Sequence, residues 1–358
     1  MVAIPKIMSG VYLIGHGGLE KLVYREDIPV PAPGVGEVLI EVKGAGVNNT
    51  DINTRLGWYS KKVTSDTNAG GTEGLSEVDG SDASWTGVPL KFPRIQGGDI
   101  CGIIVQVGEG VEQDRIGTRT IVRAMQNIPT KENPLAMQTM GSEVDGGFAQ
   151  YCVAKAKESF PINCDWSDIE LASIPISYST AEGMLCRGDI QKETILITGA
   201  SGGVGSAAIQ LAKVRGAKII AQCAPDKASA LKELGADQTV NRNDDLVKVL
   251  GENSVDAVID LVGGSSWPQL LDILRPGGKY ITSGAIAGPI VDLDLRSLYL
   301  KDLTLFGSTV NEPYVFENVI HCIEEGQIKP LVAQSFPLKE IHQAQTVFIE
   351  KKFIGKLV

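Results

Sequence analysis

The stretch Thr194–Arg215 constrains the fold more than any other part of the chain. It begins with the apolar run Ile195–Ile197, which is typical of a strand buried on both faces. A glycine-dense turn follows, reading GASGGVG over residues 199–205, and an apolar helical pattern begins at Ala207. Strand, glycine turn and helix in this order predict the first half of a nucleotide-binding βαβ unit.

The small residues of this turn have separate structural roles. Ala200, Gly202 and Gly205 stand at the spacing G-x-G-x-x-G, with alanine in the first place. Gly202 allows the backbone to approach a pyrophosphate, and Gly205 allows the helix to lie close to the strand. The free N–H groups at the helix start, near Gly203 and Val204, favour the charge of phosphates. The turn therefore predicts a dinucleotide site, although plain loops can have the same composition.

Composition restricts the class of protein. With 358 residues, 43% hydrophobic and 21% charged, the chain is long enough for two soluble globular domains. The net charge is −10 and there is no long basic run, so nucleic acid and anionic membranes are poor candidate partners. The six cysteines form no C-x-x-C pair, which argues against a disulfide framework or a cysteine zinc lobe. Neither a signal-peptide profile nor a bilayer-length apolar run is present, and we expect a cytoplasmic location.

The chain divides into two patterns. Up to about residue 165, short strands are expected at 38–42, 103–107, 120–122 and 149–153. From about 170, helices such as 227–234 alternate with strands, which predicts a parallel, doubly wound sheet. Its expected strands are 195–197, 218–223, 239–240, 257–261, 279–283 (after a turn at 275–278) and 303–307. The tail, with a helix at 314–325, is expected to pack back on the first domain.

A polar excursion interrupts the first pattern at residues 63–88, which are almost entirely Ser, Thr, Asp, Gly and Asn. Such a segment buries too little apolar surface to order itself. Two interpretations remain open here: a mobile surface loop, or a lid over the substrate with Trp85 as its anchor.

Several short motifs occur in a recognisable order along the chain. They are GVNNTD at 46–51, GGDICG at 97–102, GGFA at 146–149, Thr180-Ala181, the glycine turn, and GKLV at 355–358. In this order they resemble the medium-chain dehydrogenase/reductase superfamily. The resemblance implies an α/β protein with a GroES-like catalytic domain from residues 1–170 and 310–358. Residues 171–309 would form a Rossmann dinucleotide-binding domain, with a cleft between the two.

The metal motif of that superfamily is altered in this chain. Zinc-dependent members have Cys where this chain has Asn48, and a His-Glu pair where it has Gly98 and Asp99. Catalytic zinc needs three protein ligands, and none of the three histidines falls within these motifs. We therefore predict that no metal is bound. Asn48, together with RLGWY at 55–59, resembles the zinc-free quinone oxidoreductase branch, in which the corresponding Asn and Tyr border the nicotinamide and the substrate.

A metal-free site favours acceptors that delocalise incoming charge, such as a quinone or an α,β-unsaturated carbonyl. We expect the amide NH₂ of Asn48 and the hydroxyl of Thr50 to stabilise the developing anion, with Tyr59 or solvent supplying the proton. Each side chain also has a structural alternative. Asn48 could fix its own loop, Thr50 and Asp51 could cap a helix, and Tyr59 could be a packed aromatic. Asp99 is expected to hold backbone or an arginine.

The second strand of the βαβ unit predicts NADPH as the cofactor. NAD-binding sites place Asp or Glu about 20 residues beyond the first glycine, a position that falls here at Cys223-Ala224. Lys227 and Arg242 are candidate contacts to the 2′-phosphate, with Asp226 as a helix N-cap. The candidate cofactor-binding residues are Thr180, Ala200, Ser201, Gly202, Gly203, Val204, Cys223, Ala224, Lys227, Arg242, Val262, Gly263, Ser283, Gly284, Ala285, Phe306, Gly307 and Lys356.

Two other functions remain open. The chain could be an enoyl-thioester or aldehyde reductase of the same family, although a CoA substrate would need a basic cluster that the sequence does not show. It could also be a non-enzymatic structural or regulatory protein that binds NADPH. Whatever the reaction, the apolar strand expected at 303–307 would lie near a sheet edge, and exposed edges favour pairing with another chain. The family resemblance also implies a homodimer.

Overall fold

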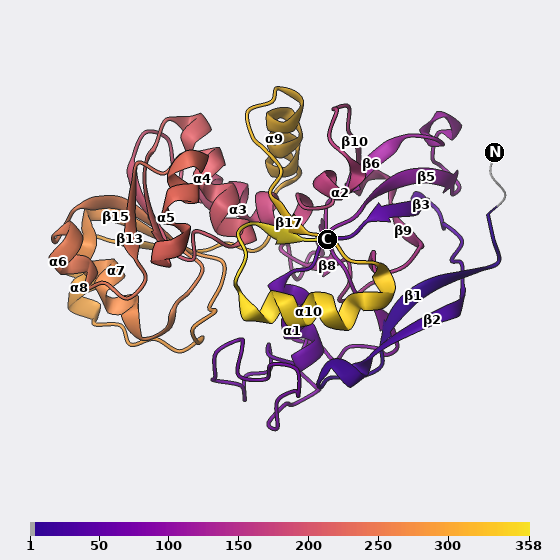
Figure 1. Ribbon diagram of the computed structural model, residues 1–358, viewed down its shortest axis with the longest axis horizontal. Coiled ribbons are helices and arrows are strands. Elements are labelled where there is room, and N and C mark those ends of the chain that lie inside the picture. Colours follow the sequence, from indigo (N-terminus) through magenta and orange to yellow (C-terminus); the bar gives the residue numbers. More distant parts are fainter. Residues whose placement is uncertain (1–3) are drawn as a thin grey trace.

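The computed structural model describes residues 4–358 and contains a parallel sheet on one side and antiparallel sheets on the other (Figure 1). In the parallel sheet the strand order is β13-β12-β11-β14-β15-β16, and all five pairings are parallel. The strands are β11 (Thr194–Ile197), β12 (Lys218–Cys223), β13 (Gln238–Asn241), β14 (Val255–Asp260), β15 (Leu274–Thr282) and β16 (Thr304–Gly307). This order, with its reversal between β11 and β14, is that of a Rossmann sheet and confirms the predicted doubly wound architecture.

Alternate residues of the central strands face different helices. Ile195 and Ile197 of β11 share a core with α3 (Pro175–Arg187) and α4 (Gly203–Arg215), whereas Leu196 shares one with α6 (Leu246–Leu250) and α7 (Trp267–Ile273). Burial on both faces explains the uninterrupted apolar run in the sequence. The remaining helices of this part are α5 (Ala228–Leu234) and α8 (Leu295–Leu300).

One sequence prediction in this sheet is wrong. The segment 275–278 was expected to be a turn preceding a strand, but it lies inside β15. The pairing of β15 with β14 is irregular there, with Val255 opposite Leu274 and Ala257 opposite Lys279. Gly277 has a φ of +74°, which only glycine adopts without strain. The residues that resemble a turn therefore form an irregularity within the strand, where residues 275–278 of β15 lie opposite a single residue of β14.

The antiparallel part consists of a five-stranded sheet, β10-β6-β5-β3-β9, a three-stranded sheet, β2-β1-β4, and the two-stranded hairpin β7-β8. Four of the strands confirm predicted ones: β3 (Glu37–Gly44), β5 (Cys101–Val107), β6 (Arg119–Val122) and β9 (Tyr151–Lys155). The others are β1 (Ile7–Leu13), β2 (Leu22–Pro29), β4 (Arg94–Ile95), β10 (Ser159–Pro161) and the hairpin β7 (Met125–Asn127) and β8 (Met137–Thr139), with helix α2 at Asp168–Leu171.

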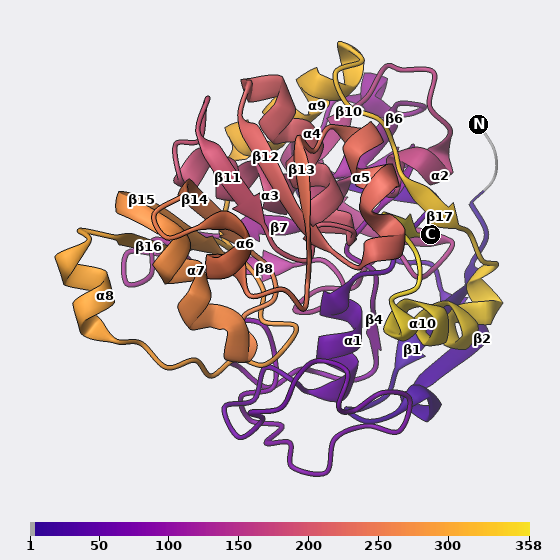
Figure 2. The same cartoon turned by 60° about the vertical axis from the view of Figure 1, so that its left-hand side comes forward.

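The C-terminal tail is shared between the two parts. Helix α10 (Ile341–Glu350) lies beside α1 (Asn49–Leu56) in the first part (Figure 2), and Phe348 and Leu56 belong to one core. Helix α9 (Pro313–Glu324) instead packs on α3, with Phe316 in the core of the parallel sheet. β17 (Val332–Gln334) pairs with β18 (Lys356–Leu357). Helix α9 also contacts the first part, because the Phe316 ring lies 5.0 Å from that of Phe160 in β10 and Glu324 accepts from the N–H of Asn163. The tail therefore packs on the first part, as expected, and α9 packs on the parallel-sheet part as well; the domain boundaries at 170 and 309 stay a prediction.

The polar excursion is packed against both parts of the molecule. It contains no helix or strand, yet Ala83 and Ser84 are fully buried. The buried guanidinium of Arg55 donates to the carbonyl oxygen of Gly71 at 3.0 Å. The N–H of Thr67 donates to the carbonyl of Ile286, in the loop after β15, at 3.1 Å. Backbone hydrogen bonds, which composition does not reveal, therefore order this segment, and its span between the two parts favours the lid interpretation.

Within residues 4–358, no helix combines the length and the apolar character that crossing a membrane requires.

Candidate active site

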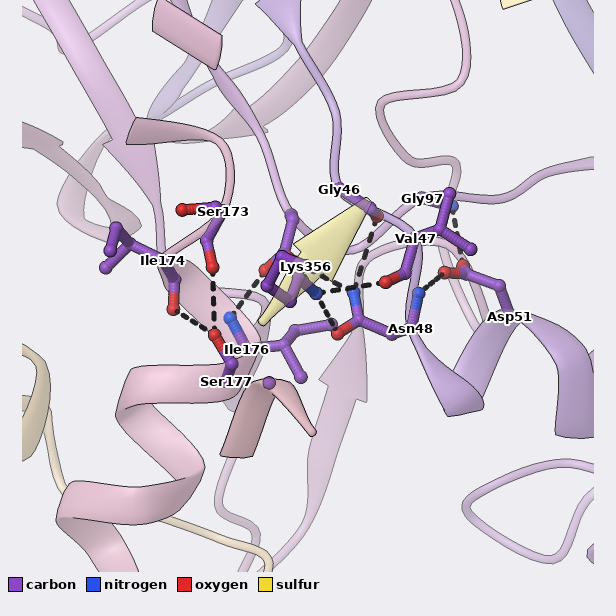
Figure 3. A network of polar contacts seen from close by, with 12 residues as sticks. Gly46, Val47, Asn48, Asp51, Gly97, Ser173, Ile174, Ile176, Ser177 and Lys356 are labelled. Carbon is purple, nitrogen blue, oxygen red and sulfur yellow. Dashed lines mark hydrogen bonds and ion pairs between the residues drawn. The ribbon is translucent and has the colours of Figure 1, made fainter. Parts of the chain in front are cut away.

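The N-terminus of α1 carries a closed network of polar contacts (Figure 3). The side chain of Asn48 donates from Nδ2 to Asp99 Oδ2 at 2.8 Å and more weakly to the Gly46 carbonyl at 3.4 Å. Its Oδ1 accepts a hydrogen bond of 2.5 Å from the ammonium of Lys356. An ammonium can only donate and a carboxylate can only accept, so these two partners fix which way the amide points.

This network occupies the side chain of Asn48, whose donor role stays a prediction. Both amide hydrogens are directed at protein oxygens, and the side chain is 6% exposed. The amide nitrogen thus has protein acceptors in the absence of a substrate, the Gly46 carbonyl being the weaker of the two. The structural alternative, in which Asn48 fixes its own loop, describes the observed geometry.

Asp99 occupies the centre of the same network. Its Oδ1 accepts from the backbone N–H of Ile176 at 2.6 Å, and its Oδ2 accepts from Lys356 Nζ at 2.6 Å. The Lys356 ammonium completes its three hydrogen bonds at the carbonyl of Val47, 3.0 Å away. Asp99 therefore holds backbone as expected, but its cation is a lysine and not an arginine.

These residues do not fit a catalytic zinc ion. Of the three positions considered, Asn48 and Gly98 supply no thiolate or imidazole, and Asp99 is already neutralised by Lys356. A zinc ion would have to displace an ammonium that is 2.6 Å from the only carboxylate of the three positions. No step of the chemistry is assigned to a metal here.

Asp51 supports the start of α1. Its Oδ2 accepts from the N–H of Asn48 at 2.8 Å, and its Oδ1 from the N–H of Gly97 at 3.1 Å. The helix-capping interpretation of Asp51 is thus confirmed. Burial raises the pKa of this carboxyl to about 7, against the opposing effect of the Asn48 N–H. Thr50, which precedes Asp51 in the chain, is half-buried.

Tyr59 lies just beyond α1 in an aromatic cluster. Its ring is 5.7 Å from that of Trp58 and 5.4 Å from that of Trp85, measured between centroids. Burial raises the pKa of the Tyr59 hydroxyl, with Asn53 opposing the shift and the charges of Asp51 and Glu143 adding to it. The hydroxyl is therefore protonated at neutral pH. Trp85 contacts Tyr59 from within the excursion, as its predicted role as an anchor requires.

The glycine turn has the shape predicted from its sequence. A Cβ on Gly205 would lie 2.4 Å from the carbonyl oxygen of Gly199 and 2.6 Å from Ala200 Cα, so the helix–strand approach requires glycine. A Cβ on Gly202 would meet only the Gly199 oxygen, at 3.5 Å, and Gly202 is exposed. The space that its missing side chain leaves open lies at the N-terminus of α4, a favourable site for a phosphate.

Lys356 connects this turn to the Asn48 network. Its stem passes so close to Gly203 that a Cβ there would lie 2.7 Å from Lys356 Cδ. The preceding residue, Gly355, donates its N–H to the carbonyl of Ser201 at 3.1 Å. The C-terminal segment therefore binds the cofactor turn to the start of α1. The close approach of the Lys356 stem therefore explains the glycine at position 203, which the dinucleotide motif itself does not require.

The other predicted cofactor residues lie mostly at one edge of the parallel sheet. Cys223 ends β12 and Ala224 follows it, Val262 and Gly263 follow β14, and the segment 283–285 follows β15. Phe306 and Gly307 end β16, while Thr180 is buried in α3. Because the strands are parallel, these ends meet at the same edge, where nucleotides bind in such sheets.

A buried carboxylate that the sequence reasoning missed shapes this edge. Asp260 accepts hydrogen bonds from the Thr198 hydroxyl at 2.6 Å, the Tyr280 hydroxyl at 2.5 Å and the N–H of Val262 at 2.9 Å. The N–H of Gly263 also points to it, at 3.2 Å. Asp260 thus positions the turn after β14. An acidic residue at the end of an apolar strand was the signal that could have identified it.

The two cations predicted to bind the 2′-phosphate differ in exposure and in hydrogen bonding. Lys227 is buried, and its ammonium donates to the carbonyls of Lys351 and Phe353, both at 2.8 Å. Arg242 is exposed, and its charge lowers the pKa of Lys227, after the larger effect of burial. Asp226 is not the expected N-cap, because α5 begins after Lys227 without a side-chain cap. Arg242 is therefore the more available of the two cations.

Comparisons with known proteins agree with this geometry. The alcohol dehydrogenase GroES-like domain matches residues 34–163, and the zinc-binding dehydrogenase model matches residues 203–325. The quinone oxidoreductase of Rattus norvegicus is 26% identical over 368 residues, covering 99% of this chain and 98% of the relative. The acryloyl-coenzyme A reductase of Sulfurisphaera tokodaii is 27% identical over 346 residues, covering 93% and 95%.

Among solved structures, one named as an alcohol dehydrogenase from Sinorhizobium meliloti 1021 is 44% identical. It has a TM-score of 0.87 and covers 100% of this chain and 97% of its own. Fold, site and comparisons together define an oxidoreductase of a class that uses a nicotinamide cofactor. The chain belongs to the medium-chain dehydrogenase/reductase superfamily.

Proposed function

We propose that this protein transfers a hydride from NADPH to a quinone or an α,β-unsaturated carbonyl compound without a catalytic metal. The observation that carries the proposal is the Lys356 ammonium, which contacts both Asn48 and Asp99 where zinc-dependent relatives place metal ligands. With no Lewis acid to stabilise an alkoxide, the acceptor itself must delocalise the added charge.

The described residues fit a dinucleotide. The open space at Gly202 and the N-terminus of α4 would hold the pyrophosphate, and Arg242 would contact a 2′-phosphate. The small residues Cys223 and Ala224 leave room for that phosphate, where an acidic residue would repel it. When bound, the cofactor supplies the hydride.

The chain's own part is to position the acceptor and provide hydrogen-bond donors. We assign the donor role to the Thr50 hydroxyl, because the Asn48 amide is occupied. The Tyr59 hydroxyl, kept protonated by burial, would provide a second donor, with solvent as the final source of the proton. The excursion at 63–88, which carries Trp85, would exclude water from the acceptor.

A panel of acceptors tests this function. NADPH oxidation would be followed with quinones, simple enones, an enoyl-CoA thioester and an aldehyde, each repeated with NADH. We expect quinones or enones to be reduced with NADPH and the aldehyde to react far more slowly. Preference for the thioester would favour the function named for the Sulfurisphaera tokodaii relative. Tight NADPH binding without turnover of any acceptor would contradict the proposal and favour the non-enzymatic alternative.

We also propose a homodimer that joins two parallel sheets. β16 ends the sheet, and Leu305 on it is exposed. Leu295, Tyr299 and Leu300 of α8 expose 62–70% of their surface nearby in the chain. Apolar side chains beside an open edge suit a second copy of the same chain. The Leu300→Asp variant should lower the mass measured by light scattering from a dimer to a monomer, and a monomeric unaltered protein at micromolar concentration would contradict the dimer.

A further inference from the structure

Three aromatic side chains come together where the excursion meets α1. Trp58 and Tyr59 follow the last turn of α1, and Trp85 belongs to the excursion itself. The Tyr59 ring contacts both of the others, at 5.7 Å from Trp58 with an interplanar angle of 76° and at 5.4 Å from Trp85 with one of 47°. All three residues are half-buried. Large aromatic side chains that stay partly uncovered offer a surface on which a further ring can pack.

The position of Trp85 is fixed by its neighbours in the chain. The hydroxyl of Ser84, a buried residue, accepts from the N–H of Val88 at 3.0 Å and closes a tight loop around Trp85. The hydroxyl of Thr86 donates to Glu143 Oε1 at 2.9 Å, which ties the loop to the segment after β8. A ring whose backbone is held on both sides loses little conformational freedom when a ligand binds.

The excursion also connects this aromatic cluster to the predicted cofactor edge. The indole N–H of Trp58 donates to the carbonyl of Ser65 at 3.0 Å. Two residues further on, the N–H and the hydroxyl of Thr67 both point to the carbonyl of Ile286, at 3.1 and 3.4 Å. Ile286 directly follows the segment 283–285, which is predicted to bind the cofactor. The excursion thus runs from the aromatic cluster to the loop that would border the nicotinamide.

The charge of the excursion limits the kind of acceptor that suits this position. Within residues 63–88 all the charged side chains are acidic: Asp66, Glu73, Glu77, Asp79 and Asp82. One of them, Asp79, is paired with Lys62 at 3.1 Å. A segment of this charge repels anions. An uncharged acceptor is therefore favoured over a thioester that carries phosphates.

We propose that Trp85 packs against a planar ring of the acceptor, beside Tyr59, and thereby selects uncharged fused-ring quinones over short open-chain enones. The inference rests on the proposed function, because it assumes hydride transfer to a quinone or enone at this site, and it narrows the substrate to one of the two classes. The aromatic ring system that delocalises the added charge is the same surface that stacks on an indole.

Steady-state kinetics of the full-length protein with NADPH test the inference. Menadione, a naphthoquinone, supplies a fused planar ring, and methyl vinyl ketone supplies a short enone without one. Trp85→Leu removes the ring and keeps an apolar side chain, whereas Trp85→Phe restores a ring. Val88→Ala is the matched control, at an exposed apolar position of the same segment. Each variant is compared with the unaltered protein for the same acceptor, so that the intrinsic reactivity of the acceptors cancels.

The expected effect is a change in KM that depends on the acceptor. Trp85→Leu should raise the KM for menadione roughly 5- to 10-fold, the value of one aromatic contact, with a smaller change in kcat. Its KM for methyl vinyl ketone and its dissociation constant for NADPH should stay nearly unchanged. Trp85→Phe should recover most of the loss, and Val88→Ala should behave like the unaltered protein.

Two results would overturn this inference and leave the reaction itself standing. An equal loss with both acceptors in Trp85→Leu would make Trp85 a structural residue of the excursion. An unchanged KM for menadione would place the acceptor ring elsewhere. If the unaltered protein reduced neither acceptor, the proposed function would fail, and this inference with it.

Discussion

Two lysines of the same C-terminal segment differ in how their charge is satisfied. Lys356 is 3% exposed and donates to Val47, Asn48 and Asp99, so that each of its hydrogens has an oxygen and its charge has a carboxylate. Lys351 has one amide oxygen, one aromatic ring and two neighbouring lysines. The ammonium of Lys356 therefore has an acceptor for each hydrogen and a carboxylate for its charge, whereas that of Lys351 has no carboxylate among residues 4–358.

This difference separates a cation that the fold neutralises from one that it does not. The superfamily motif drew attention to Asn48 and Asp99, but the protein has satisfied them internally through Lys356. Lys351 was not among the residues predicted from the sequence, and neither it nor Arg242 forms an ion pair with a carboxylate among residues 4–358. The predictions below test the contrast by its consequences, beginning with the largest.

Removing the charge of Lys356 should have the largest effect. Lys356→Met keeps most of the stem over Gly203 but leaves Asp99 buried without its cation. Breaking a buried pair in this way typically costs about 3–5 kcal/mol. We expect urea denaturation to show a loss of this size in the free energy of unfolding. A loss below about 1 kcal/mol would show that Lys356 is not a structural cation.

The same substitution at Lys351 should act in the opposite direction on the free protein. Lys351→Met removes a half-buried charge that has no carboxylate partner among residues 4–358, and we expect it to stabilise the free protein by about 1–3 kcal/mol. The native pKa of about 7 lies below the unfolded value, 10.5, so the full cost of burying the charge applies below pH 7. The gain in the free energy of unfolding should therefore be largest at pH 6 and smaller at pH 9. A destabilised variant at pH 6 would remove the contrast between the two lysines.

Two glycines of the cofactor turn should separate folding from binding. Gly205→Ala forces a Cβ against the backbone of Gly199 and Ala200, and overpacking of this kind costs about 1–3 kcal/mol. Gly202→Ala meets no such contact and should leave the free energy of unfolding within about 0.5 kcal/mol. Only the second variant should lose NADPH affinity without losing stability. Thermal unfolding and fluorescence titration would measure the two effects, and unchanged affinity in Gly202→Ala would place the phosphates elsewhere.

The smallest expected effect concerns the choice of cofactor. Arg242→Ala should raise the dissociation constant for NADPH ~10-fold, the value of one charge-assisted contact, and leave that for NADH nearly unchanged. Lys227→Ala is a less clean test, because its ammonium also binds the carbonyls of Lys351 and Phe353. Equal affinity of the unaltered protein for the two cofactors would contradict the predicted 2′-phosphate site.

The fold was largely predictable from local pattern, whereas the site was not. Buried parallel strands and glycine turns carry strong local signals, so β12 was predicted with its observed bounds and α9 within one residue at each end. The hairpin of β1 and β2 was missed because its register depends on distant contacts with β4 and Ala149. The excursion was judged by composition, but the guanidinium of Arg55 and the backbone of Ile286 order it.

The site depends on contacts between residues that are far apart in the sequence. Lys356 reaches Asp99 and Asn48 across more than 250 positions, so no local motif could show that the Asn48 amide is occupied. The sequence predicted a role for Asn48 at the site, but not the partners that its amide has in the structure. For Lys351, the sequence shows a lysine near the C-terminus and nothing of its missing counter-ion.

The central claim is that Lys356 takes the place of a metal ion in a working reductase. The most direct measurement is the zinc content of purified protein by elemental analysis, with NADPH–quinone turnover recorded on the same sample before and after chelator treatment. The account predicts zinc far below one atom per chain and a turnover rate that the chelator does not change. One zinc atom per chain, removed by the chelator together with activity, would contradict it.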